Sequence, residues 1–270
     1  MTETTSGSES YTRLPACRPA RGRRNQEKSG VSIAKRTAGS HGYVTLQPRS
    51  APTPRAFIAI EPARPNRVLL AHDGWVAYEP AWLLAASAQT LLASLLGEVE
   101  WQQGSIRLFG KQVLEPRLIA WAGEAPYRYS GRTLPPRRRP VSLARVWALA
   151  EEFAGVSFNH VLMNRYRDGQ DCMGWHSDDE AELGKNPPIL SLSLGATRRF
   201  LLKPKADLAE APRFEWSMSH GAMLFMAGST QHHYRHSVPR QRGVAAERLN
   251  LTFRRVLTPP LAESLTGQRG

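Results

Sequence analysis

Apolar positions follow a helical period in the first half of the chain and change to short runs after residue 159. Leucines recur at helical spacing across residues 80–96, where Pro80 suits a first turn, and predict one helix. Residues 142–153 predict a second helix with Ser142 as its N-cap. Turn residues separate later runs that predict strands at 160–166, 189–194, 200–203, 213–217, 222–226, 231–238 and 248–256.

Helices followed by a series of short strands indicate a mainly β protein with flanking helices, in the α+β class. A jelly roll or a sandwich with helices packed outside fits this order of elements. We expect a single domain over residues 53–258, followed by a C-terminal tail over residues 259–270. No internal repeat is visible.

The N-terminal segment, residues 1–52, differs in composition from the rest. Its first 50 residues hold nine Lys or Arg against three Glu, are rich in Ser, Thr and Gly, and have no hydrophobic period. This composition predicts a disordered basic tail. The tail is either an electrostatic arm for phosphates or a segment without a role.

Overall charge narrows the choice of partner. Hydrophobic residues make up 41% of the chain, enough for a core, and the formal charge of +13 favours nucleic acid or an acidic membrane surface. A basic surface with no partner is the alternative.

The N-terminus lacks a secretory apolar stretch, and residues 82–96 are too short and polar to span a bilayer. We therefore expect a cytoplasmic monomer, in the bacterial cytosol or associated with the nucleoid, without a membrane partner.

A candidate metal site begins with His176 and Asp178. Positions i and i+2 of an extended chain project from the same face, so both side chains can hold one ion. His236 is our candidate for the third ligand. Two histidines and one carboxylate leave three positions of Fe(II) open for a bidentate cosubstrate and O₂, whereas zinc more often takes three or four protein ligands. Other histidines in this half are alternatives: His160, His220, His232 and His233.

A candidate anchor for the cosubstrate is the strand over residues 248–254. Its alternation places Leu249, Leu251 and Phe253 on one face. The other face holds Arg248, Asn250, Thr252 and Arg254. Guanidinium groups pair bidentately with carboxylates, so this face suits a small dicarboxylate. An outer strand whose polar face meets solvent is the alternative.

These residues, in this order, resemble the AlkB family of Fe(II)/2-oxoglutarate dioxygenases. The likeness includes the His176-x-Asp178 pair, His236 followed by Ser-x-Pro, the RLNLTFR strand and an upstream Asn-Arg-Tyr, and it extends from about residue 108 to residue 255. It implies a double-stranded β-helix (jelly roll) core with an N-terminal helical and hairpin extension. It also implies iron on His176, Asp178 and His236, and a 2-oxoglutarate site built from Asn164, Tyr166, Arg248, Asn250, Thr252 and Arg254.

The resemblance also implies a substrate and a chemistry. The family uses O₂ and 2-oxoglutarate to remove N-methyl groups from bases such as 1-methyladenine and 3-methylcytosine, releasing formaldehyde, succinate and CO₂. Residues 108–111 are similar to the hairpin of members acting on duplex DNA, so Phe109 is a candidate wedge for base extrusion, or else a core residue. Residues 127–131 resemble their base-stacking segment, with Tyr127, Tyr129 and Ser130 as substrate contacts.

Charged residues add two further expectations. Asp179 and Glu180 would favour a cationic damaged base, or are surface acids. Basic groups are candidates for phosphate contacts with alkylated duplex or single-stranded DNA, or are solvated faces: Arg137 to Arg139, Arg198, Arg199, Lys203 and Lys205. RNA or protein substrates, a catalytically silent nucleic-acid-binding jelly roll and a zinc protein remain the alternative functions.

Overall fold

The structure, a computed structural model, describes residues 58–59, 66–108, 111–129, 131–208 and 210–257. Both expected tails therefore lie outside the described residues. The same is true of residues 53–57, 60–65 and 258 at the two ends of the predicted domain. Phe109 and Ser130, two of the predicted substrate contacts, also lie outside the described residues.

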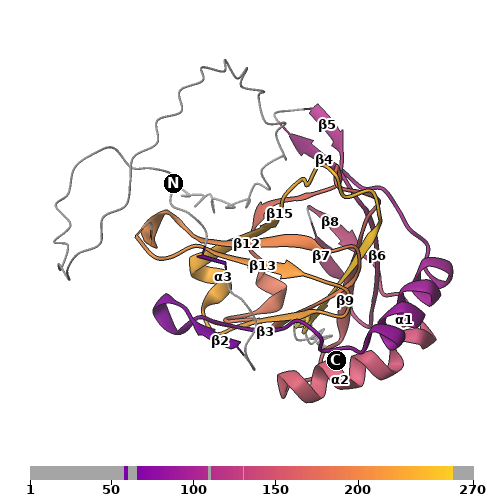
Figure 1. The fold of residues 1–270 in the computed structure, drawn as a ribbon, viewed down its shortest axis with the longest axis horizontal. Helices are drawn as coiled ribbons and strands as arrows, with labels where there is room; N and C mark the ends of the chain where they lie inside the picture. Colours follow the sequence, from indigo (N-terminus) through magenta and orange to yellow (C-terminus); the bar gives the residue numbers. More distant parts are fainter. Residues whose placement is uncertain (1–57, 60–65, 109–110, 130, 209, 258–270) are drawn as a thin grey trace, which may run out of the picture. The chain divides into compact units, whose positions relative to one another are not determined.

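Two β-sheets form the core of the fold (Figure 1). The larger sheet contains, in spatial order, β2 (Asn66–Leu69), β3 (Trp75–Glu79), β14 (Met223–Ala227), β11 (Ile189–Gly195), β16 (Arg248–Arg254), β9 (His160–Tyr166) and β6 (Leu118–Gly123). The smaller sheet contains β1 (Ile58–Ala59), β13 (Phe214–Met218), β12 (Arg198–Pro204), β15 (Tyr234–Val238) and β10 (Met173–His176). Two hairpins stand apart from these sheets: β4 (Ser105–Leu108) with β5 (Lys111–Leu114), and β7 (Tyr127–Tyr129) with β8 (Arg132–Leu134).

The chain passes repeatedly between the two sheets. Strands β11 and β14 are antiparallel neighbours in the larger sheet, while the intervening β12 and β13 are neighbours in the smaller one. Strand β15 then joins the smaller sheet and β16 the larger. This alternation is that of a jelly roll, and it confirms the predicted fold class.

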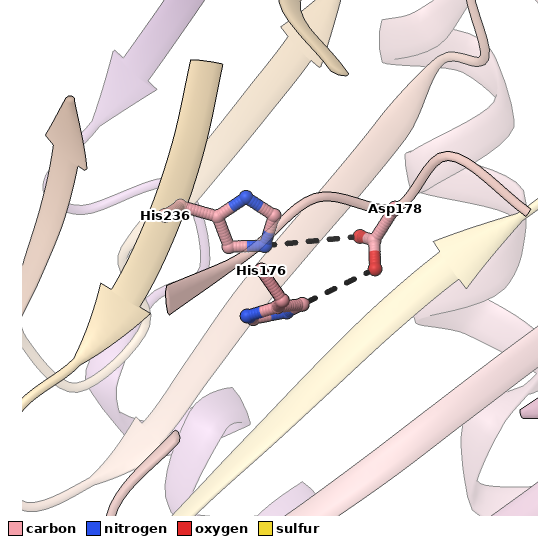
Figure 2. A group of neighbouring side chains, drawn as sticks. All are labelled: His176, Asp178 and His236. Carbon is pink, nitrogen blue, oxygen red and sulfur yellow. Dashed lines mark ion pairs between the residues drawn. The ribbon is translucent and has the colours of Figure 1, made fainter. Parts of the chain in front are cut away.

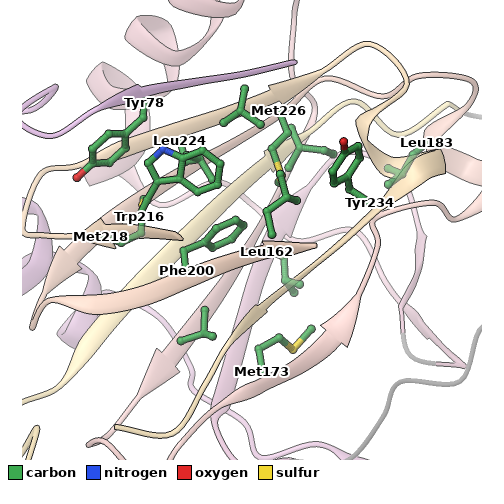
Figure 3. Packing of buried hydrophobic residues seen from close by; sticks show 14 of the residues in the cluster. Tyr78, Leu162, Met173, Leu183, Phe200, Trp216, Met218, Leu224, Met226 and Tyr234 are labelled. Atoms are coloured by element: carbon green, nitrogen blue, oxygen red, sulfur yellow. The ribbon is translucent and has the colours of Figure 1, made fainter. Parts of the chain in front are cut away.

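Hydrophobic side chains fill the space between the sheets (Figure 3). Trp216, Phe200 and Phe214 form a group of rings from β12 and β13, with Phe200 and Trp216 centroids 6.3 Å apart. Leu224 and Met226 of the larger sheet face them from β14. The inward positions of both sheets therefore form one core, as expected when apolar residues alternate along each strand.

Helices α1 (Ala85–Glu98) and α2 (Ala144–Ala154) pack on the outer face of the larger sheet (Figure 1). Trp147 of α2 meets Phe253 of β16 edge to face, with ring centroids 5.3 Å apart. The apolar face of β16, which includes Leu249 and Leu251, is thereby buried under the helices. Shorter helical turns are α3 (Thr230–His233), Ala71–Asp73, Val141–Leu143, Ala181–Leu183 and Ala206–Leu208. No helix among the described residues is both long and apolar enough to cross a membrane.

Three sequence-based boundaries were wrong. The first helix begins at Ala85 rather than Pro80, because the preceding turn is tied to the sheet through the Leu83 N–H, which donates to the Gly221 carbonyl. The Ser142 hydroxyl donates to Glu98 and caps no helix. The predicted strand 231–238 is divided, because residues 230–233 form α3 before β15 begins.

Candidate active site

The structure brings His176, Asp178 and His236 together between the two sheets (Figure 2). His176 ends β10 and faces His236 of β15 across an antiparallel pair. Asp178 follows two residues after His176, and its carboxylate lies 4.0 Å from His176 Nε2 and 3.9 Å from His236 Nε2. One potential ligand atom from each residue lies within 4.8 Å of the others. This spacing and donor set suit one divalent metal ion, with room left for further ligands.

Hydrogen bonds hold the His176 side chain and the backbone of Asp178. The Nδ1 atom of His176 lies 2.9 Å from the Gly174 carbonyl, which can only accept, so Nδ1 carries the proton and Nε2 presents its lone pair to the site. The backbone N–H of Asp178 donates to the Gln231 side chain at 2.9 Å. His236 stacks on Phe200, with ring centroids 5.3 Å apart. The ligand set is thus held in place by its own surroundings.

Local electrostatics keep the site in the protonation state that a metal requires. Burial lowers the pKa of His236 to about 3, and burial also lowers that of His176, so both imidazoles are neutral near pH 7. Burial would raise the pKa of Asp178, but the charge and hydrogen bond of Arg254, together with the two nearby histidines, leave this pKa below its usual value. Neutral imidazoles and an ionised carboxylate are the forms that bind a cation.

Arg254 is held by the metal-site carboxylate. Its Nη2 donates to Asp178 Oδ1 at 2.7 Å, and both side chains are almost fully buried. Burial alone would lower the pKa of Arg254, but Asp178, Tyr127, Glu180 and Tyr129 together raise it above the usual arginine value. Its Nε and Nη1 atoms are buried and have no hydrogen-bond partner in the part of the chain that the structure describes. Arg254 therefore fixes Asp178 and keeps two donors for another acceptor.

Arg248 is a buried guanidinium without a carboxylate partner among the described residues. Its Nε donates to Ser193 at 2.8 Å and its Nη2 to Asn250 at 2.7 Å, whereas Nη1 is buried and has no hydrogen-bond partner among the described residues. Burial lowers the pKa of Arg248 to about 10, so it stays charged near neutral pH. A buried cation costs free energy unless it is paired with an anion. We therefore expect an anionic ligand to bind beside Arg248.

The polar face of β16 is buried, which excludes the alternative of an outer strand facing solvent. Asn250 pairs in register with Asn164 of β9 and Ser193 of β11, and Arg248 pairs with Tyr166. A cavity between the sheets includes most of the predicted site and is lined by Leu162, Asn164, Tyr166, Met173, His176, Asp178, Ser191, Phe200, Met226, His236, Val238, Asn250, Thr252 and Arg254. The predicted metal ligands thus share one cavity with the predicted cosubstrate contacts Asn164, Tyr166, Asn250, Thr252 and Arg254, whereas Arg248 lies buried behind its lining.

The predicted base-stacking residues lie deeper than expected. Tyr127 is 0% exposed, and its ring contacts His160 at 4.7 Å and the Arg254 guanidinium at 5.6 Å. The hydroxyl of Tyr129 accepts a hydrogen bond from Arg117 at 2.8 Å. Neither ring presents an open face in this conformation, and base stacking by these tyrosines stays a prediction.

The two acidic residues after the metal-site aspartate differ in their surroundings. Asp179 accepts from Lys205 Nζ at 3.1 Å on the outside of the site. Glu180 is mostly buried near Tyr127, Asp178 and Arg254, and burial together with the charge of Asp178 raises its pKa to about 7. Glu180 is therefore the better placed of the two to face a cationic group beside the metal site.

Several predicted phosphate contacts have other roles. Arg198 is buried and donates to the backbone carbonyls of Asp168, Asp171 and Pro239, so its assignment to phosphate was wrong. Arg199 forms a bidentate ion pair with Glu215. Of the remaining predicted contacts, Arg137 and Arg139 pair with Glu100 and Glu124, and Lys203 lies 4.4 Å from the Trp175 ring centroid. Arg138 is exposed and stays a predicted phosphate contact.

The alternative histidines lie outside the metal group. Within the described part of the chain, no other three His, Cys, Asp or Glu side chains converge as closely. His220 accepts from the Gly195 N–H, and His232 accepts from the Asn186 N–H. His160 is buried beside Tyr127, and burial lowers its pKa to about 3.

Three residues of the site were missed by the sequence analysis. Gln231 positions Asp178, and Glu115 and Arg117 form a buried ion pair next to Asn164. Gln231 carries no sequence signal that distinguishes it. Glu115 and Arg117 did carry a sequence signal, because they stand directly before the apolar run of β6. Charged residues are seldom found beside a buried strand unless they are paired.

Comparisons with known proteins agree with this geometry. The 2OG-Fe(II) oxygenase superfamily matches the chain over residues 76–254. "Alpha-ketoglutarate-dependent dioxygenase alkB homolog 3" of Rattus norvegicus is 37% identical over 228 residues, which cover 78% of this chain and 74% of that protein. "DNA oxidative demethylase ALKBH2" of Mus musculus is 40% identical over 182 residues, covering 64% of this chain and 76% of that protein.

Proposed function

Because this chain belongs to the AlkB family of 2OG-Fe(II) oxygenases, we propose that it removes N-methyl groups from damaged bases in DNA. The observation that supports this most strongly is the pairing of two sites in one cavity. A His-Asp-His group suited to Fe(II) shares its cavity with Tyr166 and Asn250. Both of these residues flank Arg248, a buried cation that lacks a carboxylate partner among the described residues. A metal site alone would not need that arginine.

His176, Asp178 and His236 would hold Fe(II) through two imidazole nitrogens and one carboxylate. Arg248 would pair with the distal carboxylate of 2-oxoglutarate, since no described residue supplies an acceptor to its Nη1. With these groups bound, O₂ oxidises 2-oxoglutarate to succinate and CO₂ and hydroxylates the N-methyl group, which then leaves as formaldehyde. The protein's part is to orient the cosubstrate and base and to exclude water from the cavity.

Three observations support DNA as the substrate. The relative from Mus musculus is described as a DNA oxidative demethylase. The chain carries a formal charge of +13, which favours a polyanion. Glu180 lies beside the metal site, where its carboxylate can stabilise the positive charge of 1-methyladenine or 3-methylcytosine.

Formaldehyde release tests the proposal directly. The full chain with Fe(II), 2-oxoglutarate and O₂ is incubated with 3-methylcytosine in duplex DNA, single-stranded DNA and RNA, and with a methylated peptide. Release from either DNA supports the proposal, and the ratio of the two defines the strand preference. Release only from RNA or only from the peptide would show that the proposed DNA substrate is wrong. Succinate formation with none of them would leave a dioxygenase without the proposed substrate class.

Substitution of Glu180 by glutamine is expected to reduce the preference for the methylated over the unmodified cytosine. At pH 8, above its pKa of about 7, Glu180 is mostly ionised, so the variant loses a charge interaction with the cationic base. We expect about a tenfold fall in the ratio of kcat/KM values, equivalent to roughly 1.4 kcal/mol.

Asp179→Asn is the matched control for this prediction. Asp179 is the neighbouring acid, but Lys205 already neutralises it outside the site. Its substitution is expected to leave the preference unchanged. An equal fall in both variants, or none in Glu180→Gln, would show that Glu180 has no part in selecting the cationic base.

A further inference from the structure

Arg117 joins three parts of the structure through one buried guanidinium. Its Nε donates to Asn164 Oδ1 at 2.8 Å on β9. Its Nη2 donates to Glu115 Oε1 at 2.9 Å and to the Tyr129 hydroxyl at 2.8 Å on β7. The arginine and glutamate side chains are 4% and 1% exposed. Such a fully buried, paired charge has one favoured geometry, because any other leaves donors unsatisfied.

The contact with Arg117 fixes which way the Asn164 amide points. Arginine only donates hydrogen bonds, so the atom of Asn164 that it contacts must be the carbonyl oxygen. The NH₂ group of Asn164 is therefore turned away from Arg117. Asn164 lines the cavity between the sheets, and within the described part of the chain its NH₂ group donates to no protein atom.

Asn250, the register partner of Asn164, is arranged differently. Its Oδ1 accepts from Arg248 and Ser191, and its NH₂ group donates to Thr252 at 2.9 Å. The Asn250 amide thus uses its oxygen and one of its two NH₂ protons in holding its neighbours. Of the two facing amides, Asn164 is the one with both NH₂ protons left for an acceptor in the cavity.

We propose that Arg117 is a positioning residue that holds the Asn164 amide with its NH₂ group towards the cavity, where it donates to 2-oxoglutarate. This inference rests on the proposed function, which supplies the dicarboxylate. Arg117 does not itself contact the cosubstrate. It acts by excluding the flipped amide, in which a carbonyl oxygen would face the carboxylate and repel it.

The surroundings of Glu115 show why Arg117 cannot shift easily. Arg132 of β8 donates to Glu115 Oε2 at 3.0 Å, so the carboxylate is held from two sides. Gly104, just before the β4–β5 hairpin, leaves the space for this pair, because a Cβ atom there would lie 2.1 Å from Glu115 Oε2. The orientation of Asn164 is therefore connected to the base of that hairpin.

The test measures 2-oxoglutarate binding without turnover. The anaerobic full-length protein with Fe(II) is titrated with 2-oxoglutarate, and the charge-transfer absorbance gives its Kd. Arg117→Lys keeps the charge but not the fork geometry, and we expect its Kd to rise about tenfold, as for Asn164→Ala. Because both act through one amide, the double variant should be no weaker than the weaker single variant.

Asn164→Asp keeps the test decisive if Arg117→Lys fails to fold. Aspartate still accepts from Arg117, so the variant should keep the wild-type Tm, yet it lacks the NH₂ donor and should bind 2-oxoglutarate more weakly than Asn164→Ala. The control is Arg165→Lys, the next residue on β9, which pairs with Glu247 at 2.9 Å. Its Kd should not change.

Wild-type affinity in Asn164→Asp, or additive effects of Arg117→Lys and Asn164→Ala, would overturn the inference while leaving the proposed function intact. Absence of any charge-transfer band in the wild-type protein would instead contradict the proposed function. The Tm and the Fe(II) affinity measured without 2-oxoglutarate are expected to stay near wild type in Asn164→Ala and Asn164→Asp. A parallel loss of all three properties in Asn164→Asp would indicate a purely structural role and overturn the inference.

Discussion

Replacing Asp178 by asparagine is expected to abolish the iron site while preserving its shape. The variant loses the negative charge that lies within 4.0 Å of both histidines, so we expect Fe(II) affinity to fall by about 100-fold or more. It also leaves Arg254 as a buried cation without its ion-pair partner. This loss should lower the free energy of unfolding by roughly 3 kcal/mol. Anaerobic Fe(II) titration and urea denaturation measure the two effects.

Asp179→Asn provides the matched control for the iron-site prediction. The carboxylate of Asp179 is the next one along the chain but pairs with Lys205 outside the metal group. Its variant should bind Fe(II) as the wild type does. If Asp178→Asn kept its Fe(II) affinity, the three residues would be neighbours without being ligands, and the iron assignment would be wrong.

The second large effect is expected at Arg248. Substitution by methionine removes the guanidinium that has no carboxylate partner among the described residues, and 2-oxoglutarate affinity should fall by about 100-fold or more, since a buried charge pair to a ligand contributes roughly 3 kcal/mol. Fe(II) affinity should not change, because Arg248 contacts none of the metal-site residues. The free energy of unfolding without cosubstrate should stay equal or rise, because an uncompensated buried charge is removed.

Arg198→Met distinguishes this effect from a general consequence of removing a buried arginine. Arg198 also lies beside Tyr166, with its guanidinium 5.4 Å from the ring centroid, compared with 5.2 Å for Arg248. Its donors, however, are satisfied by backbone carbonyls. We expect this variant to lose stability and to keep its affinity for 2-oxoglutarate. The reverse pattern in the two variants would exclude Arg248 as the anchor of the dicarboxylate.

Local sequence patterns were sufficient to predict β9 and β16, two strands that carry residues of the site. The bounds of β9 were predicted as observed, and the alternation in residues 248–254 placed Arg248 and Arg254 on the correct face of β16. The polar face of β16 was recognisable because it held no lysine or glutamate, which a solvated face usually contains. Short-range spacing also brought His176 and Asp178 together, since a two-residue separation needs no knowledge of the fold.

Long-range contacts explain what the sequence did not reveal. Gln231 reaches Asp178 across 53 residues, and Arg117 reaches Asn164 across 47. Neither pair has a spacing from which contact could be inferred. The two arginines were expected to act alike on the dicarboxylate, but register places Arg254 next to Asp178 and Arg248 next to Tyr166. Strand pairing, which sequence periodicity does not specify, decided their separate roles.

The pairing of His176 with His236 has a consequence for the edge of the smaller sheet. Strand β10 is the last strand of that sheet, and β15 is its one neighbour among the described strands. An ion bound by both imidazoles would cross-link these two strands. A shift of one residue in the register of β10 against β15 would turn one imidazole to the opposite face of the sheet and break this cross-link. Loading with metal should therefore slow amide hydrogen exchange in β10 more than in β9, which is enclosed between two neighbours.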